Sequence, residues 1–259
     1  MRRAAALAVL LLVPPAAGGA PTLHRTAAAQ TWRPDVRAAR AYAAERGGTV
    51  SFALRTRQRL YGYRSREATS SASVVKAMLM VAYLNRVGVR GRALRRVDLD
   101  LIEPMIVRSS NRDATRVHDI VGNGALAHLA RRVGMRDFAP SESWGATQIT
   151  AADQTRFFLR LERYVVRRHR DTALRLLGSI VPRQRWGIAR VRPKGWALYF
   201  KGGWTPQRQN QVGLLRRGSR RLALAVFTRG YPNPLYGRET QRGVAARLLR
   251  GLTAASAPR

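Results

Sequence analysis

Residues 70–84 read SSASVVKAMLMVAYL, and this stretch decides which fold the chain can adopt. From Val74 onward nearly every side chain is apolar, so a helix built from the stretch is apolar on all sides. A helix without a polar face is buried at the centre of a domain. Ser70 and Ser71 are suitable residues to cap its N-terminus. We therefore expect a buried central helix from Ser70 to Val87, with the other elements packed around it.

Residues 70–84 contain one charged residue, Lys76, and lysine is scarce in this chain. Lysine and arginine total 48, but only Lys76, Lys194 and Lys201 are lysine, which leaves 48 − 3 = 45 arginines. Arginine keeps its proton at workable pH, whereas burial lowers the pKa of a lysine until its amine acts as a base. Lysines retained in such a chain therefore indicate sites that need lysine chemistry. Ser73 lies one turn before Lys76 on the same helix face, which predicts a serine nucleophile activated by lysine.

Composition excludes several classes of protein. The chain has 259 residues, 46% of them hydrophobic, which is enough to form a domain-sized core. It has no cysteine, so disulfides, thiolate zinc sites and thiol nucleophiles are excluded, and its four histidines lack metal-site spacing. We expect no metal or cofactor. The net charge of +34 would suit nucleic acid or anionic cell wall, but the arginines are spread along the chain without a nucleic-acid-binding motif. We expect a basic surface that attracts anionic cell wall, and no nucleic-acid function.

The first 29 residues are typical of a secretory signal peptide with a short leader. Arg2 and Arg3 precede an apolar stretch at 4–13 that is too short to span a bilayer, and small residues follow as candidate cleavage sites. We expect a secreted protein without an integral membrane segment, unless the signal stays uncleaved as an anchor. Residues 253–259 are expected to form a disordered tail.

The order of the expected elements predicts the fold class. Two strands precede a block of helices, and three strands follow it. Strands from both ends would pair into one antiparallel sheet of about five strands, flanked by helices and interrupted by an inserted helical subdomain, which is an α/β sandwich over residues 33–252. The expected helices are 33–46, 70–87, several within 94–132, one opening at the capping box Thr150–Asp153, and 238–252; the expected strands are 49–54, 59–63, 196–201, 211–215 and 222–228.

A second polar motif, Ser109-Ser110-Asn111, follows a short apolar run and is expected where a helix passes into a loop. A second hydroxyl at such a place relays a proton to a leaving nitrogen, and an amide holds a substrate carbonyl. A plain helix-capping turn is the competing interpretation of the segment.

A third motif, Lys201-Gly202-Gly203, ends the strand expected from Trp196. Its lysine would supply positive charge for a substrate carboxylate, and its two glycines would let a substrate backbone lie close along the strand. The backbone N–H of Trp204, with that of Ser73, is a candidate oxyanion hole. The alternative is that Lys201 is an ordinary surface residue of the strand.

Three motifs in this order resemble the penicillin-recognising serine hydrolases, with the class A β-lactamase branch nearest. The resemblance covers about residues 33–252. The family pattern is S-x-x-K, S-D-N and K-T-G; the first is matched fully, the second has serine for aspartate, and the third has glycine for threonine. The resemblance implies that Ser73 is the nucleophile, Lys76 its base, Ser109 the proton relay, Asn111 a substrate-binding amide and Lys201 the carboxylate anchor, beside Gly202, Gly203 and Trp204.

The chain departs most from the family in the Ω-loop. In class A enzymes this loop carries an E-x-x-L-N motif, whose glutamate activates the water that clears the acyl-enzyme. The corresponding residues 136–145 lack that motif, and Glu142 is their only glutamate. Glu142 is thus a candidate base, with an ordinary loop carboxylate as the alternative. Only 36 residues separate Ser73 from Ser109 (109 − 73), which implies trimmed loops.

Simpler interpretations stand beside these. Ser73 could be a plain N-cap and Lys76 a lysine reaching toward solvent, and Lys194 is expected to be a loop charge. His118 and Asp119 suggest a catalytic triad, but adjacent helix positions point apart, so we expect an ordinary histidine.

The sequence therefore predicts a secreted serine hydrolase that forms an acyl-enzyme on Ser73 with a β-lactam or a D-alanyl peptide-like substrate, with slow hydrolysis. Two alternatives remain open. One is a catalytically decayed fold-mate that binds anionic cell-wall polymer. The other is an esterase or amidase that uses the same site.

Overall fold

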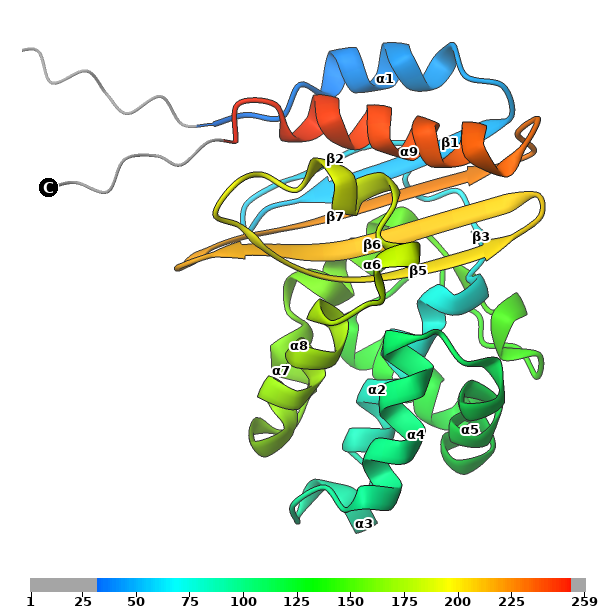
Figure 1. Cartoon of the computed structure of the whole chain (residues 1–259), viewed down its shortest axis with the longest axis vertical. Coiled ribbons are helices and arrows are strands. Elements are labelled where there is room, and N and C mark those ends of the chain that lie inside the picture. The colour runs from blue at the N-terminus through cyan, green and yellow to red at the C-terminus, as the bar shows by residue number, and fades with distance from the viewer. Residues whose placement is uncertain (1–31, 253–259) are drawn as a thin grey trace, which may run out of the picture. The chain divides into compact units, whose positions relative to one another are not determined.

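The computed structural model describes residues 32–252, whose centre is a five-stranded antiparallel sheet (Figure 1). The expected signal peptide and C-terminal tail lie outside the described residues. The strand order in the sheet is β2-β1-β7-β6-β5. The strands are β1 (Thr49–Arg55), β2 (Leu60–Tyr63), β5 (Ala197–Thr205), β6 (Arg208–Arg217) and β7 (Arg220–Arg229). The predicted fold class, an α/β sandwich with about five antiparallel strands, is confirmed.

The sheet joins the two ends of the described chain. Strand β1 pairs with its neighbour β2 on one side and with β7 on the other, where Ser51 lies opposite Phe227. Strands β6 and β7 extend beyond the predicted ranges because their arginine-rich ends stay paired, as in Arg217 opposite Arg220. Strand β5 has a strand partner on one side only. Its other edge faces the segment that carries Ser73.

Helices cover both faces of the sheet. Helices α1 (Val36–Ala44) and α9 (Pro234–Leu249) lie together on one face, and the α-helices of the segment between β2 and β5 lie on the other (Figure 1). Helix α1 begins after Asp35, whose side chain accepts a hydrogen bond from Ala38 N. Helix α9 starts earlier than the predicted residue 238, because Asn233 caps it by accepting a bond from Tyr236 N.

The predicted single helix over 70–87 is wrong at its start. The structure has a short strand β3 (Thr69–Ser70), a 3-10 turn η1 (Ala72–Val75) and only then helix α2 (Lys76–Leu84). Ser70 pairs with Gln148, and Ala72 has a left-handed backbone with φ 47°, which a continuous α-helix cannot contain. Ser71 does not cap the turn as expected, since its hydroxyl donates to the carbonyl of Ala72. The predicted burial is correct: all nine residues of α2 are buried.

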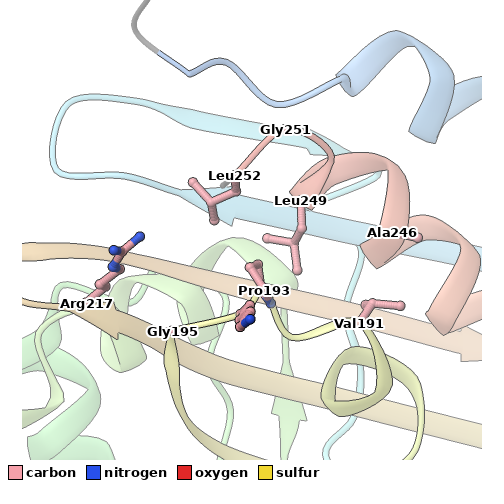
Figure 2. A pocket seen from close by; sticks show the side chains of 9 residues that line it. Val191, Pro193, Gly195, Arg217, Ala246, Leu249, Gly251 and Leu252 are labelled. Atoms are coloured by element: carbon pink, nitrogen blue, oxygen red, sulfur yellow. The ribbon is translucent and has the colours of Figure 1, made fainter. Parts of the chain in front are cut away.

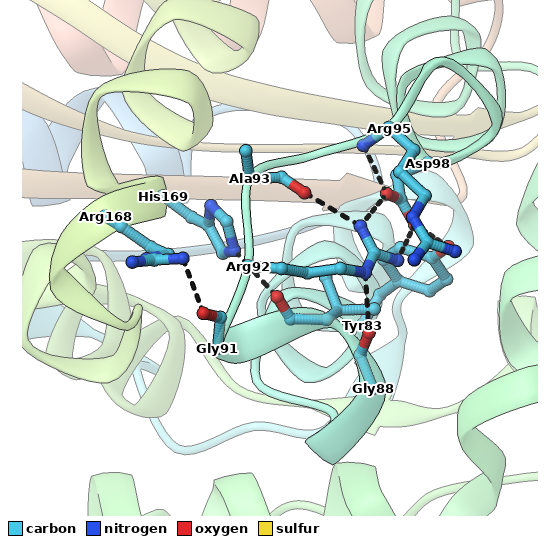
Figure 3. A network of polar contacts seen from close by, with 10 residues as sticks. Tyr83, Gly88, Gly91, Arg92, Ala93, Arg95, Asp98, Arg168 and His169 are labelled. Carbon is cyan, nitrogen blue, oxygen red and sulfur yellow. Dashed lines mark hydrogen bonds and ion pairs between the residues drawn. The ribbon is translucent and has the colours of Figure 1, made fainter.

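The inserted helical subdomain packs against α2. Its long helices α4 (Arg96–Val107) and α5 (Asn111–Val133) fall within the predicted helical region, and α5 is kinked at Gly122. Asp98 of α4 accepts hydrogen bonds from Tyr83 at 2.8 Å and from Arg92 at 2.6 Å (Figure 3). This buried carboxylate ties the central helix to α4.

Of the two hydrogen bonds that define the predicted capping box at Thr150, the structure has the one accepted by the Thr150 side chain. The Thr150 hydroxyl accepts from Asp153 N and opens α6 (Ala151–Leu159). The Asp153 carboxylate instead accepts from the backbone N–H groups of Arg136 and Asp137.

The remaining elements are α3 (Val87–Arg90), η2 (Trp144–Ala146), β4 (Gln148–Ile149), α7 (Leu161–Tyr164), η3 (Arg167–His169), α8 (Arg170–Gly178), η4 (Pro182–Gln184) and η5 (Gly187–Val191). Within residues 32–252, no helix is long and apolar enough to cross a membrane.

Candidate active site

Ser73 lies in the 3-10 turn η1, at the point where the chain enters the buried helix. Its side chain is half-buried, while its neighbours Ala72 and Val74 are buried. The first N–H groups of a helical turn have no partner within the turn, so the backbone N–H of Ser73 is available to a ligand. The left-handed backbone of Ala72 costs free energy, and strain of this kind is often found beside reactive groups.

Lys76 is fully buried one turn after Ser73. Its Nζ donates to the backbone carbonyl of Ser109 at 2.7 Å, to Asn111 Oδ1 at 2.8 Å and to Ser109 Oγ at 3.4 Å. Burial lowers the pKa of Lys76 to about 7, and the nearby carboxylate of Asp113 opposes that shift. The amine is therefore free to take up a proton near neutral pH.

The Ser109 hydroxyl lies between two lysines. Lys201 Nζ donates to Ser109 Oγ at 3.0 Å and to the carbonyl of Gly202 at 3.0 Å. Lys201 is completely buried, so it is not the surface residue of the alternative interpretation, and burial together with the Lys76 cation holds its pKa well below the usual value. Ser109 itself has a left-handed backbone, with φ 60°. The three motifs that are separate in sequence thus meet at one hydroxyl.

The capping role in the second motif belongs to Ser110. Its hydroxyl accepts from Asp113 N at 3.3 Å and opens helix α5. Ser109 and Asn111, on either side, are turned toward Lys76. The helix-capping interpretation is correct for the middle residue and does not account for the other two.

The third motif lies in close contact with the backbone of Ser73. A β-carbon placed on Gly203 would lie 2.5 Å from Ser73 N and 2.8 Å from the carbonyl oxygen of Ser71. A β-carbon on Gly202 would meet nothing nearer than 3.6 Å. Asn210 of β6, opposite Gly203 in the register, reaches across to donate to the carbonyl of Ser70 at 2.9 Å. Strand β5 therefore runs directly beside the nucleophile turn.

Trp204 continues β5 past the glycines and marks the outer end of the site. Its side chain is 41% exposed, and its ring meets Trp186 edge-on with 6.2 Å between centroids. Its position next to Gly203 brings its backbone near the turn that holds Ser73.

Trp144 is a site residue that the sequence analysis missed. Its ring centroid lies 4.8 Å from Lys76 Nζ, and its indole N–H donates to Thr115 Oγ1 at 3.1 Å. The loop that carries it is fastened to the nucleophile segment, since Ser71 N donates to the carbonyl of Thr147 at 2.8 Å. The family resemblance points to a carboxylate within residues 136–145 and carries no expectation for the tryptophan in the same stretch. The available signal was a tryptophan beside the polar residues 141–143.

The Glu142 side chain is exposed, and its hydrogen bond goes to Asn123 and not to a residue of the three motifs. Its carboxylate accepts from Asn123 Nδ2 at 2.8 Å, and Asn123 is in turn hydrogen-bonded to the His118 ring at 3.0 Å. Neither Ser73 nor Lys76 is among its hydrogen-bond partners in the described part of the chain. The His118 side chain is buried, and its ring is hydrogen-bonded to Asn123 rather than to Asp119.

Other parts of the molecule do not complete this site. Over residues 32–252, no group of three histidine or carboxylate side chains could hold a metal ion. A cavity of about 750 Å³ lies between the loop Val191–Gly195 and the end of α9, and its walls include Leu249 and Leu252 (Figure 2). Its lining contains none of the predicted site residues, although the exposed Lys194 is part of it.

The fold and the site together define a class. Ser73 precedes the buried helix, and the Ser109 hydroxyl lies between the buried lysines Lys76 and Lys201; these are the residue types of a serine nucleophile assisted by lysine. The sheet and inserted helices are those of the penicillin-recognising hydrolases.

The chain belongs to the beta-lactamase enzyme family, whose model matches residues 94–252. The match covers Ser109 and Lys201, and it begins after Ser73 and Lys76. No curated protein matches the chain.

Solved structures share the fold at low identity. A β-lactamase from Sphaerobacter thermophilus is 23% identical with a TM-score of 0.73, covering 86% of this chain and 98% of its own. A β-lactamase from Burkholderia vietnamiensis is 19% identical with a TM-score of 0.73, covering 90% and 100%. A variant of PBP-A, described as an acyl-enzyme complex with penicillin G, is 17% identical with a TM-score of 0.71, covering 84% and 95%.

Proposed function

We propose that the protein is a serine hydrolase that forms an acyl-enzyme on Ser73 with a β-lactam or a related carboxylate-bearing amide. The observation that carries the proposal is the Ser109 hydroxyl, which contacts the buried amines of both Lys76 and Lys201. Two lysines of lowered pKa around one hydroxyl form a path along which a proton can move.

The proposed acylation step begins at Ser73. Ser73 Oγ attacks the substrate carbonyl carbon and gives its proton to neutral Lys76. The oxyanion is stabilised by the backbone N–H groups of Ser73 and Trp204. The bond from carbon to nitrogen then breaks, and Ser109 passes a proton to the leaving nitrogen, restored from the Lys76 ammonium. Asn111 holds the substrate amide, and Lys201 gains a full charge when a substrate carboxylate approaches.

Hydrolysis of the acyl-enzyme is proposed to be slow. Water needs a base near Ser73, but the hydrogen bond of Glu142 goes to Asn123, and the face of Lys76 is covered by the Trp144 ring. An apolar ring at that place excludes water. These contacts favour a penicillin-binding acceptor over a fast β-lactamase.

We also propose that the protein is exported and acts outside the cytoplasm. The support is the basic, then apolar, then small-residue order of the first 29 residues. Comparing the mass of the protein in the culture medium with that of the full chain tests this directly.

The test of function is intact-mass spectrometry of the purified protein, sampled over time with benzylpenicillin. A stable adduct on Ser73 is the expected result. A transient adduct with accumulating penicilloate would mean efficient hydrolysis and would make Glu142 the next residue to mutate. With no adduct and intact penicillin, acylation by β-lactams is excluded, and short acyl esters then test the esterase alternative.

A further inference from the structure

A second cavity, of about 520 Å³, lies among helices of the inserted subdomain. Its lining shares no residue with the candidate active site. Four arginines and a histidine surround it, together with an asparagine, the end of α7 and the loop that follows α7, and the lining contains no carboxylate. The lining residues are Asn85, Arg90, His128, Arg132, Arg163, Tyr164, Val165, Val166 and Arg170. Arg90, Arg132, Arg163 and Arg170 of this lining form the arginine cluster.

The arginine cluster has no counter-charge. Across residues 32–252, none of its four guanidinium groups forms an ion pair, whereas eight other arginines do. Like charges that converge on one cavity repel one another, and the repulsion is relieved when an anion enters. The cavity is therefore electrostatically prepared for a negatively charged ligand.

The wall of the cavity is held in place by its own hydrogen bonds. The Asn85 amide donates to the carbonyl of Tyr164 at 2.6 Å and accepts from Val166 N at 3.1 Å. Arg170 Nε donates to the carbonyl of Val165 at 3.2 Å, which fixes the guanidinium and leaves its other N–H groups for a ligand. The Arg170 guanidinium is thus held in place before a ligand arrives, which lowers the conformational entropy that it loses on binding.

We propose that this cavity binds phosphate groups carried on a ligand without nucleobases, such as an oligophosphate or a phosphodiester-linked polymer. Guanidinium groups match phosphate oxygens with paired hydrogen bonds. The volume exceeds what one phosphate needs and falls within the roughly 300–1,000 Å³ typical of small-molecule sites, so several phosphates can enter. This inference does not depend on the chemistry of Ser73.

Nucleic acid is disfavoured by the aromatic content of the cavity. Binding of single strands relies on aromatic rings on which bases stack. The lining has no tryptophan or phenylalanine, and the ring of its one tyrosine, Tyr164, already stacks on Phe157 with 6.0 Å between centroids and 21° between planes. The cavity therefore provides positive charge for phosphates but no free tyrosine, tryptophan or phenylalanine ring on which a base could stack.

The first test is calorimetric titration of the purified full-length protein with inorganic tripolyphosphate at low salt. We expect saturable binding that weakens at least 10-fold in the double variant R132Q/R163Q. The matched control is R37Q/R59Q, which removes two exposed arginines outside the cavity and is expected to bind within about twofold of the unchanged protein. Thermal melting of both variants checks that they fold. Equal losses in the two variants, or binding that does not saturate, would overturn the proposal.

The second test separates the possible sources of phosphate. A base-free glycerol-phosphate oligomer and an oligonucleotide with the same number of phosphates are each titrated into the protein and into R132Q/R163Q. Cluster-dependent binding of the oligomer would assign a phosphodiester polymer, and cluster-dependent binding of tripolyphosphate alone would assign a small oligophosphate. Cluster-dependent binding of the oligonucleotide alone would overturn the proposal in favour of nucleic acid.

Discussion

Gly203 and Ser73 are in such close contact that position 203 has no room for a side chain. The ideal β-carbon of residue 203 would stand 2.5 Å from Ser73 N and 2.9 Å from Val74 N, both of them backbone atoms. Backbone atoms cannot rotate away as the end of a side chain can. The distance between strand β5 and the nucleophile turn is therefore set by the absence of this one β-carbon.

We predict that Gly203→Ala removes acylation. The added methyl group must push β5 away from η1, which separates the Ser73 and Trp204 backbones that are proposed to bind the oxyanion. Loss of one oxyanion donor costs about 10²–10³ in rate, and we expect a loss of at least that size. The rate of benzylpenicillin adduct formation by mass spectrometry is the measurement.

Gly202→Ala is the matched control for this prediction. Its β-carbon would meet Gln211 and Trp186 at an ordinary 3.6 Å, so acylation should stay within a fewfold of the unchanged protein. If both variants acylate alike, the close approach at Gly203 is not required for the reaction.

Lys76→Arg should be inactive although it keeps the positive charge. Arginine does not release its proton at workable pH, so Ser73 would lack a base, and no labelling by a fluorescent penicillin is expected. Ser73→Ala should also be unlabelled, because it lacks the nucleophile. Lys194→Arg, the same change at an exposed lysine, should label normally. Labelling of the Lys76 variant would place the base elsewhere.

Acylation should rise with pH through about 7. The pKa of Lys76 is lowered to about 7, chiefly by burial, so the neutral amine that accepts the Ser73 proton becomes the main form above that pH. We call this rise of the acylation rate with pH the rising limb of the pH profile. Asp113→Asn should move the limb to lower pH, because the Asp113 carboxylate favours the charged form of Lys76. The pH profile of the acylation rate constant measures both. A limb that moves to higher pH in the variant would contradict the assignment.

Removing the ring of Trp144 should move the same limb to higher pH. In Trp144→Ala water reaches Lys76, and its pKa rises toward the ordinary value as the effect of burial weakens. The ring also attracts the ammonium from 4.8 Å, and losing that attraction acts in the opposite direction by about 0.5–2 kcal/mol. Because burial is the largest cause of the shift, we expect it to dominate.

A conservative variant checks the role of Trp144. Trp144→Phe keeps an apolar ring over the lysine and should hold the limb near its original pH. Faster clearance of the acyl-enzyme is expected in the alanine variant only, since only that variant admits water. An unchanged pH profile in Trp144→Ala would mean that the ring has a purely structural role.

Because of Asp98, the free energy of unfolding should fall as the pH becomes acidic. Its hydrogen bond from Arg92 is the main reason that its pKa falls to about 2, against about 3.9 in an unfolded chain. A depressed carboxylate pKa stabilises the fold above about pH 4, and that contribution is lost as the pH falls from about 4 to about 2. We expect Asp98→Asn to lower the free energy of unfolding at pH 7 by about 2–3 kcal/mol, measured by urea denaturation.

Asp100→Asn is the control for Asp98. Asp100 pairs with Arg96 at 2.8 Å in the same helix, but both side chains are more than half exposed, and such pairs contribute about 0.2–1 kcal/mol or less. Equal destabilisation by the two changes would mean that the buried network around Asp98 (Figure 3) adds nothing special.

Much of the fold was predictable because it is encoded in local patterns. Apolar residues on every side of 74–84 indicated the buried helix, and short apolar runs indicated the strands that became β1, β2, β5, β6 and β7. The start of α2 was not predictable in the same way. Whether Ser70 begins a helix or joins a strand depends on Gln148, which lies far along the chain and pairs with Ser70.

The sequence by itself determined which chemical groups the site contains, because the serine and lysine motifs and the scarcity of lysine are properties of residue type and short spacing. Only the tertiary structure decided how these groups meet: the Ser109 hydroxyl between two lysines, the Trp144 ring over Lys76, and the arginine cluster assembled from separate segments. The physical reason is that hydrogen bonding, burial and charge repulsion act through space. Residues 92 positions apart, such as Ser109 and Lys201, come within 3.0 Å only after the sheet and the helical subdomain have packed together.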